Sequence, residues 1–377
     1  MTAVDLERVR RRVAQDPVLA GAATQRGPAL RAAIARAVRA ERLLLDDRGL
    51  AAVVREMADL FTGLGPAERL LRDPGVTDVL INGPDEVWVE RDGRLERTSV
   101  TYPDAESLRA AVLRVVGPQG LRFDRAHPTV DTRLPDGSRL HAVGEPLAAG
   151  GPLVTVRTFA TIQHSWDDLE AVGAVPAAAR ELLCAAVADR RAIVCCGRTG
   201  TGKTTLLGLL LGEVTAQERV VVVEDAPELR PVCPHVVRLE TRPGGPDGGA
   251  AVEFRDLVRQ ALRMRPDRIV VGEVRGTEVV DVLAALATGH EGCMTTVHAR
   301  AADEALVRLE GMALLAGLPV PAIRAQLAVS LDLVVVLGRD PDGRRGLRQV
   351  ARVDGTGPDG RLRWHDLWRA DPGQVGP

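Results

Sequence analysis

The chain has 377 residues, of which 45% are hydrophobic and 27% are charged, as expected for a globular protein of about two domains. A net charge of −2 and an aromatic content of 2% argue against a strongly basic nucleic-acid binder and against stacking surfaces for single strands. The five cysteines show no CxxC spacing, which favours reduced, buried thiols. The sequence contains no apolar run of bilayer length and no secretory signal, so we expect a cytoplasmic protein without a membrane span of its own.

The first half of the chain indicates two structural types. Residues 1–62 predict a helical N-terminal extension, because apolar residues recur at helical spacing between Arg and Glu. Its arginines form either a solvated face or a patch for an acidic partner. Residues 63–143 predict a smaller α+β domain with short strands, Gly/Asn/Asp turns and one helix. Residues 144–164 predict a linker to a third region, residues 165–377: residues 144–152 are rich in Gly and Pro, and residues 153–159 follow as an extended segment.

That third region alternates helical segments with short apolar runs. Such runs, separated by helices, indicate an α/β fold whose largely parallel sheet is covered on both faces. The predicted strands are 191–196, 219–225, 235–240, 267–273, 293–298 and 331–338.

The stretch GRTGTGKTT, residues 197–205, follows the first of these runs and precedes a helical pattern. Its G-x-x-x-x-G-K-T form lets backbone amides surround phosphate oxygens at a helix N-terminus. The 49 basic residues of the chain are 48 arginines and one lysine, Lys203, which stands where a compact ammonium fits better than a guanidinium. We predict that Lys203 contacts the β- and γ-phosphates and that the Thr204 hydroxyl ligates Mg²⁺. The predicted nucleotide-binding residues are Gly197, Arg198, Thr199, Gly200, Thr201, Gly202, Lys203, Thr204 and Thr205.

The single lysine also bears on the base. Ras-like GTPases read guanine with an Asn-Lys-x-Asp loop, and this chain has no second lysine from which to build one. ATP is therefore favoured by elimination.

Two acidic side chains end apolar runs. Glu224 ends VVVVE and Glu273 ends RIVVGE, and in open parallel sheets ligands bind beyond the carboxyl ends of the strands. We predict that Glu273 positions or deprotonates water and that Glu224 assists through the metal or the water. Both are candidate Mg²⁺ ligands with Thr204. Either glutamate taken alone could equally be a solvated residue after a strand.

The stretch TGHEGCMTTVHA, residues 288–299, contains His290 and His298. No carboxylate or Cys completes a zinc set around them, and a lone His is more often structural. We favour a role in sensing phosphate or bridging to a moving domain.

Together these motifs resemble the secretion-ATPase superfamily of type II and type IV secretion and type IV pili. GRTGTGKTT, VVVEDAPEL, RIVVGEVRG and TGHEGCMTTVHA look like its Walker A, Asp box, Walker B and His box, in the same order. HVVRLETRP, FRDLVRQALRMRP and DVLINGPDEVWVERDGRLE look like the CpaF branch, the ATPases of tight-adherence (Flp) pili. The resemblance covers residues 64–370 and is weak over the first 60.

The resemblance implies a RecA-like P-loop NTPase domain in a homo-hexameric ring, which hydrolyses ATP and works on inner-membrane platform proteins at the cytoplasmic face. It implies that arginines of the N-terminal domain contact the terminal phosphates, and Arg133, Arg139 and Arg157 match those positions. An arginine there would neutralise charge on the transferred phosphoryl group. Taken without the family, the LPDGSR stretch predicts only a hairpin turn. The predicted catalytic set is Glu273, Glu224, Lys203, Arg133, Arg139, Arg157, His290 and His298.

Two alternatives stay open. One is a RecA-like motor that translocates DNA in conjugation or partition, although the composition predicts no direct nucleic-acid contact. The other is a nucleotide-gated assembly scaffold with little turnover, which would keep Lys203 but not need Glu273.

Overall fold

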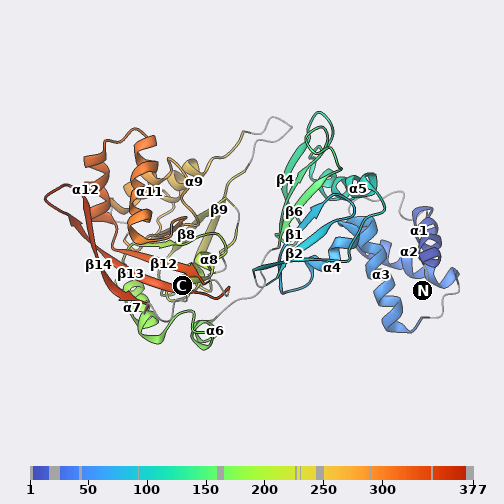
Figure 1. The fold of residues 1–377 in the computed structure, drawn as a ribbon, viewed down its shortest axis with the longest axis horizontal. Coiled ribbons are helices and arrows are strands. Elements are labelled where there is room, and N and C mark those ends of the chain that lie inside the picture. Colours follow the sequence, from blue (N-terminus) through green and yellow to red (C-terminus); the bar gives the residue numbers. More distant parts are fainter. Residues whose placement is uncertain are drawn as a thin grey trace. The chain divides into compact units, whose positions relative to one another are not determined.

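The computed structural model describes residues 3–16, 26–41, 45–91, 93–158, 165–225, 227–229, 231–242, 250–287, 291–340 and 343–370. They divide into two units, Met1–Thr161 and Ile162–Pro377 (Figure 1). Each unit has hydrophobic clusters of its own. None of the helices in these ranges combines the length and the apolarity that a membrane-crossing segment needs.

The first unit begins with the predicted helices. Val9 and Val13 lie one helical turn apart and are buried together with Ile34 and Met57 of the two following helices. The Asp46 carboxylate accepts a backbone N–H and caps the third helix. The three helices are α1 (Ala3–Ala14), α2 (Arg26–Ala40) and α3 (Asp47–Thr62).

The rest of the first unit is an antiparallel sheet with one covered face. Its strand order is β3-β2-β1-β6-β5-β4. Leu108 and Val112 of helix α5 (Ala105–Val116) are buried in one cluster with Val79 and Val154, so α5 covers the face on which these side chains lie. The strands are β1 (Val76–Asn82), β2 (Val87–Arg91), β3 (Arg94–Arg97), β4 (Thr129–Arg133), β5 (Arg139–Val143) and β6 (Leu153–Arg157).

Strand β6 differs from the sequence prediction. Residues 144–164 were predicted as a linker, but Leu153–Arg157 pairs with β1 and β5 inside the N-terminal sheet. The physical reason is its period of two: Val154 and Val156 are buried, while the residues between them are exposed. The extended segment expected at 153–159 thus contains a strand, and this strand belongs to the N-terminal sheet and not to a linker.

The second unit is built on an eight-stranded sheet of order β14-β13-β12-β7-β11-β10-β8-β9 (Figure 1). The six strands from β7 to β12 are mutually parallel, as predicted from the continuous apolar runs. They are β7 (Ile193–Cys196), β8 (Val220–Glu224), β9 (Val236–Glu240), β10 (Arg268–Val271), β11 (Met294–Val297) and β12 (Leu333–Arg339).

Helices cover both faces of this sheet, and each face has a separate core. One core combines the strands with α7 (Ala177–Ala188) and α8 (Lys203–Gly212), and a buried Trp166 from α6 (Trp166–Ala171) joins it. The opposite core uses α9 (Phe254–Ala261), α10 (Val279–Ala287), α11 (Ala302–Leu315) and α12 (Val320–Ser330). This is the two-faced arrangement predicted for a parallel sheet.

The last two strands are antiparallel and were not predicted. β13 (Arg345–Thr356) pairs with β12, and β14 (Leu362–Arg369) forms the sheet edge beyond it. Arginines interrupt the apolar residues of β13, and β14 is mostly exposed, so neither contains the continuous apolar run that identified the six parallel strands.

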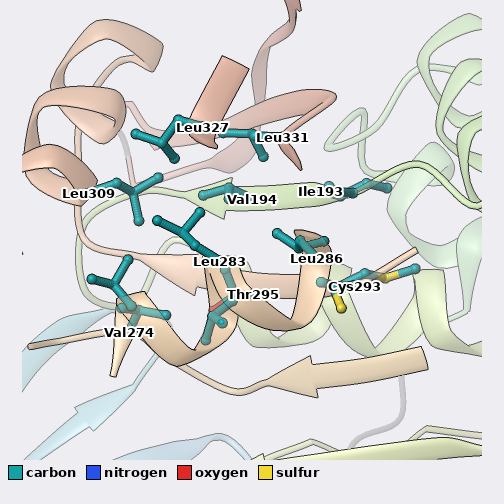
Figure 2. A pocket seen from close by; sticks show the side chains of 14 residues that line it. Ile193, Val194, Val274, Leu283, Leu286, Cys293, Thr295, Leu309, Leu327 and Leu331 are labelled. Atoms are coloured by element: carbon teal, nitrogen blue, oxygen red, sulfur yellow. The ribbon is translucent and has the colours of Figure 1, made fainter. Parts of the chain in front are cut away.

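An apolar cavity of about 20 Å³ lies on the face of the large sheet that α10, α11 and α12 cover (Figure 2). Leu283 and Leu286 of α10 line it together with Ile193 and Val194 of β7. It has room for about one water molecule but offers hardly any hydrogen-bond partners. We interpret it as a packing gap in the core and not as a nucleotide site.

Candidate nucleotide-binding site

The carboxyl ends of four parallel strands bring the predicted site residues to one edge of the sheet. Cys196 at the end of β7 is in register with Val297 of β11, and Val271 of β10 is in register with Val223 of β8. The residues that follow these strands are therefore neighbours. The phosphate loop begins after β7, Glu224 is the last residue of β8, Glu273 follows β10, and His298 follows β11.

The loop between β7 and α8 has the backbone of a phosphate cradle. Gly200 and Gly202 have φ values of 72° and 94°, a region that residues with a side chain rarely adopt. A Cβ at Gly197 would lie 2.8 Å from the Leu337 carbonyl oxygen, so only glycine fits there. Nothing lies within 4 Å of the position that a Cβ would take at Gly200 or Gly202. Glycine is thus required at these two positions by the backbone conformation and not by lack of space, and the loop leads into the N-terminus of α8, where an anion is favoured.

The other loop residues differ in exposure. Arg198 and Thr199 are exposed, whereas Thr201 is buried and its hydroxyl donates to the Arg198 carbonyl at 2.8 Å. Thr204 and Thr205 are partly exposed in the first turn of α8. The Thr204 hydroxyl therefore remains accessible for the metal role that the sequence predicts.

Lys203 is buried, with 8% of its surface exposed. Its ammonium donates to the carbonyl oxygens of Gly197 at 3.0 Å and Arg198 at 3.1 Å. Burial lowers the pKa of this ammonium, and the nearby Glu273 carboxylate opposes that effect. The only lysine of the chain is thus held inside the loop, where it can exchange carbonyl contacts for phosphate contacts.

His298 lies between Lys203 and Glu273. Its Nδ1 is 3.5 Å from the Lys203 ammonium, and its Nε2 is 2.9 Å from Glu273 Oε1. Burial first, and then the Lys203 charge, lower the pKa of His298 and favour the neutral ring. A neutral ring with its proton on Nε2 suits both contacts, although the N–H is not aimed well enough at Oε1 for a hydrogen bond.

Glu273 is surrounded by positive charge. Its Oε2 accepts a hydrogen bond from Arg275 Nη2 at 2.9 Å. Burial tends to raise the pKa of Glu273, but Arg275, His298 and Lys203 together outweigh burial and lower it. The carboxylate is therefore ionised at neutral pH, and Oε1 is a buried acceptor without an aligned donor. The group beside it is His298 Nε2, at 2.9 Å.

Arg275 is a site residue that the sequence analysis did not single out. Besides Glu273, its guanidinium approaches Asp225 Oδ2 at 3.9 Å. The only available signal was its place in GEVRG, two residues after the strand-end glutamate.

Glu224 lies in a different environment from Glu273. It is buried, with 3% of its surface exposed, and its Oε1 accepts hydrogen bonds from the backbone N–H groups of Glu228 and Leu229, each at 2.9 Å. Burial raises the pKa of Glu224 to about 7 despite these hydrogen bonds. Its Oε2 has no partner. The predicted metal and catalytic roles of Glu224 stay predictions, and the contacts of Oε1 are with the backbone.

Glu228 was also missed by the sequence analysis. It is exposed, and its carboxylate acts electrostatically on Lys203 and Arg275, raising the pKa of each. The segment that follows β8 thus adds a negative charge to the surroundings of Lys203 and Arg275.

Comparison with known proteins identifies the family. Residues 61–355 match the family described as Type II/IV secretion system protein. The chain belongs to this family. A protein of Mycobacterium tuberculosis, named for conjugal transfer, is 43% identical to this family member over 336 residues, which are 88% of this chain and 95% of that protein. Type IV secretion system protein PtlH of Bordetella pertussis is 35% identical over 313 residues, or 74% of this chain and 89% of PtlH.

Solved structures agree with the fold of this secretion-system protein. The ATPase DotB of Legionella pneumophila has a TM-score of 0.57 at 23% identity, over 76% of this chain and 80% of DotB. The pilus retraction motor PilT has a TM-score of 0.53 at 18% identity, over 75% of this chain and 80% of PilT. At these identities the likeness shows the fold alone, a RecA-like P-loop domain with a smaller N-terminal domain.

The three arginines that the resemblance implies lie in the first unit of this family member. Arg133, Arg139 and Arg157 are register partners across β4, β5 and β6, so they form one row on one face of the sheet. Arg157 also pairs with Asp78 of β1, with Nε 3.2 Å from Oδ1. The phosphate loop belongs to the second unit, so contact between this row and phosphates stays a prediction.

His290 lies outside the described residues, and its predicted role also stays a prediction. Its described neighbour Gly292 is close to Arg268, the first residue of β10: a Cβ at Gly292 would lie 2.6 Å from Arg268 Nη1. Gly292 is thus at the edge where the strands begin, whereas Lys203, Glu273 and His298 are at the edge where they end.

The site suits a nucleotide-bound Mg²⁺ better than a protein-held metal. In the part of the chain that the structure describes, no three His, Cys, Asp or Glu side chains gather into a metal-binding group. Mg²⁺ that arrives with a nucleotide needs only one or two protein ligands. Thr204, partly exposed in the first turn of α8, and the ionised carboxylate of Glu273 fit that requirement by their chemistry.

Proposed function

We propose that this protein is an ATP-hydrolysing motor of a type II/IV secretion or pilus-assembly machine. The observation that carries the proposal is the chain of contacts from Lys203 through His298 to Glu273 beside the glycine-rich phosphate loop. The loop cradles the phosphates of ATP, and Lys203 contacts the β- and γ-phosphates. Thr204 holds Mg²⁺, which supplies charge neutralisation on the phosphates when bound.

Glu273 acts on the attacking water. Its lowered pKa keeps the carboxylate ionised, which a base needs. His298 couples the two ends of the chain, because it lies within reach of both Lys203 and Glu273. A shift of Lys203 toward phosphate would change the contacts of His298 and thereby those of Glu273.

The motor works as a homo-hexamer at the cytoplasmic face of the inner membrane. The row of Arg133, Arg139 and Arg157 closes on the terminal phosphates, and His290 helps to transmit the nucleotide state. Opening and closing of the first unit drives inner-membrane platform proteins. The motifs of the N-terminal domain support a CpaF-like role in Flp pilus assembly. The names of DotB, PilT and PtlH support a secretion or pilus machine in the broader sense.

ATP turnover by wild type and Glu273→Gln, with oligomer mass from light scattering, tests this function. We expect the wild type to hydrolyse ATP as a hexamer. We expect the variant to bind ATP with unchanged affinity while turnover falls at least about 100-fold, the effect of losing a general base. A variant that turns over like the wild type would contradict the role of Glu273. A wild type that binds but does not hydrolyse, even with membranes that carry its partners, would favour the scaffold.

A DNA-translocating motor is the second candidate, because one relative is named for conjugal transfer. It predicts that DNA stimulates ATP turnover several-fold. The same assay with and without double-stranded DNA separates the two motors, since the protein-secretion motor predicts no stimulation.

A further inference from the structure

We propose that Glu224 is a positioning residue: its buried carboxylate holds the Glu228–Leu229 backbone so that Glu228 faces the phosphate loop, and it does not ligate the metal. The proposal rests on the proposed function for its kinetic consequences. The claim that Glu224 anchors this backbone depends only on the contacts of Glu224 and not on the proposed function.

One of the two carboxylate oxygens is committed to backbone donors, while Oε2 is buried without a hydrogen-bond partner among the described residues. Glu224 Oε1 accepts from two successive N–H groups, those of Glu228 and Leu229, both at 2.9 Å. Hydrogen bonds to a carboxylate that is shielded from water are among the stronger ones in proteins. Two such bonds from neighbouring amides fix both the position and the direction of this backbone.

The side chain has little freedom to leave these donors. A Cβ at Gly272, on the neighbouring strand end, would lie 2.9 Å from Glu224 Cγ, so Glu224 is packed against a position that only glycine allows. The backbone of Glu224 is tied as well, because its carbonyl accepts from Thr241 N–H at 3.2 Å. Turning Oε1 toward a metal would break its two hydrogen bonds to the backbone N–H groups of Glu228 and Leu229.

A similar arrangement, in which a glutamate accepts hydrogen bonds from two successive backbone N–H groups, occurs after the neighbouring strand β10. Glu278 Oε1 accepts from the backbone N–H groups of Arg275 and Gly276, at 2.6 and 2.8 Å. A glutamate thus holds the segment after β10, which carries Arg275, as Glu224 holds the segment after β8, which carries Glu228. Each held segment presents a charged side chain to the site.

Glu228 is the side chain that would be displaced without this anchor. Its carboxylate acts on Lys203 and on Arg275, the two cations that flank Glu273 in the electrostatics of the site. Loosening the segment would change the charge around Lys203 without removing any group from the phosphate loop. We therefore expect turnover to fall while ATP affinity is kept.

Two substitutions in the full chain separate anchoring from metal binding. Glu224→Gln keeps an oxygen that can accept both N–H groups but removes the negative charge, whereas Glu224→Ala removes the acceptor. Amide hydrogen exchange at Glu228 and Leu229 reports the anchor directly. ATP turnover titrated with MgCl₂ reports the metal. Glu240→Gln, at the exposed residue in register with Glu224 on β9, is the matched control.

For Glu224→Gln we expect the amides of Glu228 and Leu229 to exchange at the wild-type rate. The Mg²⁺ concentration that gives half-maximal turnover should be unchanged, and kcat should stay within about threefold of the wild-type value. For Glu224→Ala we expect exchange about tenfold faster or more and kcat about tenfold lower, because each lost bond to a charged acceptor contributes about 1.5–3 kcal/mol. We expect the KM for ATP to change less than twofold. Gly272→Ala, which pushes on Cγ, should also accelerate exchange and provides a second perturbation if the alanine variant folds poorly.

Two results would overturn the proposal. One is a Glu224→Gln variant as impaired as Glu224→Ala, with a raised Mg²⁺ requirement, since the charge would then be what matters. The other is unchanged exchange at Glu228 and Leu229 in Glu224→Ala and in Gly272→Ala. If the wild type proves not to hydrolyse ATP, the proposed function fails, but the exchange measurement still decides whether Glu224 is the anchor.

Discussion

The ends of β8 and β10 both carry a glutamate, but the two are one residue out of register, since Val223 pairs with Val271 and Glu224 therefore lies beside Gly272. The two glutamates differ in burial, in pKa and in neighbours. Glu224 is buried, its pKa is raised to about 7, and its contacts are backbone N–H groups. Glu273 is partly buried, with 22% of its side chain exposed, its pKa is lowered, and its neighbours are Arg275, His298 and Lys203. Two acids with opposite environments suit two different tasks, one structural and one chemical. Position after a strand thus brings a carboxylate to the site but does not decide what it does there.

The largest expected effect is the loss of ATP affinity when Lys203, the cation near Glu273, is replaced. Lys203→Met should weaken ATP binding about 100-fold, because truncating one partner of a buried charge contact costs about 3 kcal/mol. Equilibrium binding of a fluorescent ATP analogue measures this. Arg198→Met, at an exposed position of the same loop, should change affinity far less. Equal losses in the two variants would contradict a special role for the buried ammonium.

The next largest effect is the pH dependence of stability that follows from the raised pKa of Glu224. The pKa of Glu224 is raised from 4.5 to about 7 in the folded protein, so its ionisation opposes folding. The penalty is absent below pH 4.5, grows as the pH rises, and is complete above pH 7. Glu224→Gln lacks it, so its free energy of unfolding relative to wild type should increase over this range by up to roughly 3 kcal/mol.

Urea unfolding at pH 4.5 and pH 8 tests this prediction. Glu218→Gln is the control with the opposite sign, since Glu218 pairs with buried Arg268 and its pKa is lowered. Its loss should destabilise the protein at pH 8 and matter less as the pH falls. A stability difference for Glu224→Gln that does not vary with pH would contradict the raised pKa.

A smaller effect on turnover is expected for Arg275, which contacts Glu273 after β10 and tests what lowers the pKa of Glu273. Arg275→Gln removes the strongest influence that lowers the pKa of Glu273, so that pKa should rise. A general base works only when ionised, and the acidic limb of the kcat profile should therefore move to higher pH. We expect about a tenfold loss of kcat near neutral pH from the displaced carboxylate. Arg300→Gln, a 72% exposed arginine paired with Glu304, should leave the profile in place.

The smallest effect concerns the backbone that carries Glu273. The Thr296 hydroxyl donates to the Gly272 carbonyl at 2.7 Å, joining the end of β10 to β11. Thr296→Val should cost about 1 kcal/mol of unfolding free energy, the net contribution of one hydrogen bond. Thr295→Val is the matched control, because the Thr295 hydroxyl makes only a 3.5 Å contact and lines the apolar cavity. Equal costs would contradict the hydrogen bond between the strands.

The parallel core could be predicted from sequence because its signal is local. Continuous apolar runs identified all six parallel strands, and the Gly-rich loop identified the start of α8. The hairpin of β13 and β14 could not be predicted in the same way, since its arginines interrupt the apolar pattern. β6 was misjudged because the Gly- and Pro-rich stretch before it suggested a linker that extended across a short alternating strand.

The site was predictable in its members but not in their environments. Lys203, Glu273 and His298 could be named from motifs, and the structure brings them together. Whether a strand-end glutamate is buried against backbone amides or surrounded by arginine depends on residues that are distant in sequence. Gly272 packs on Glu224 from another strand, and His298 reaches Glu273 from β11. Such contacts exist only once the sheet has formed.

The most direct test of this account compares turnover by Glu273→Gln and Glu224→Gln in one assay at saturating Mg²⁺ and ATP. The two substitutions are chemically identical and lie at the ends of neighbouring strands. We predict at least about a 100-fold loss for Glu273→Gln and at most about a threefold loss for Glu224→Gln. Similar losses in both variants would contradict the division of roles between the two strand ends.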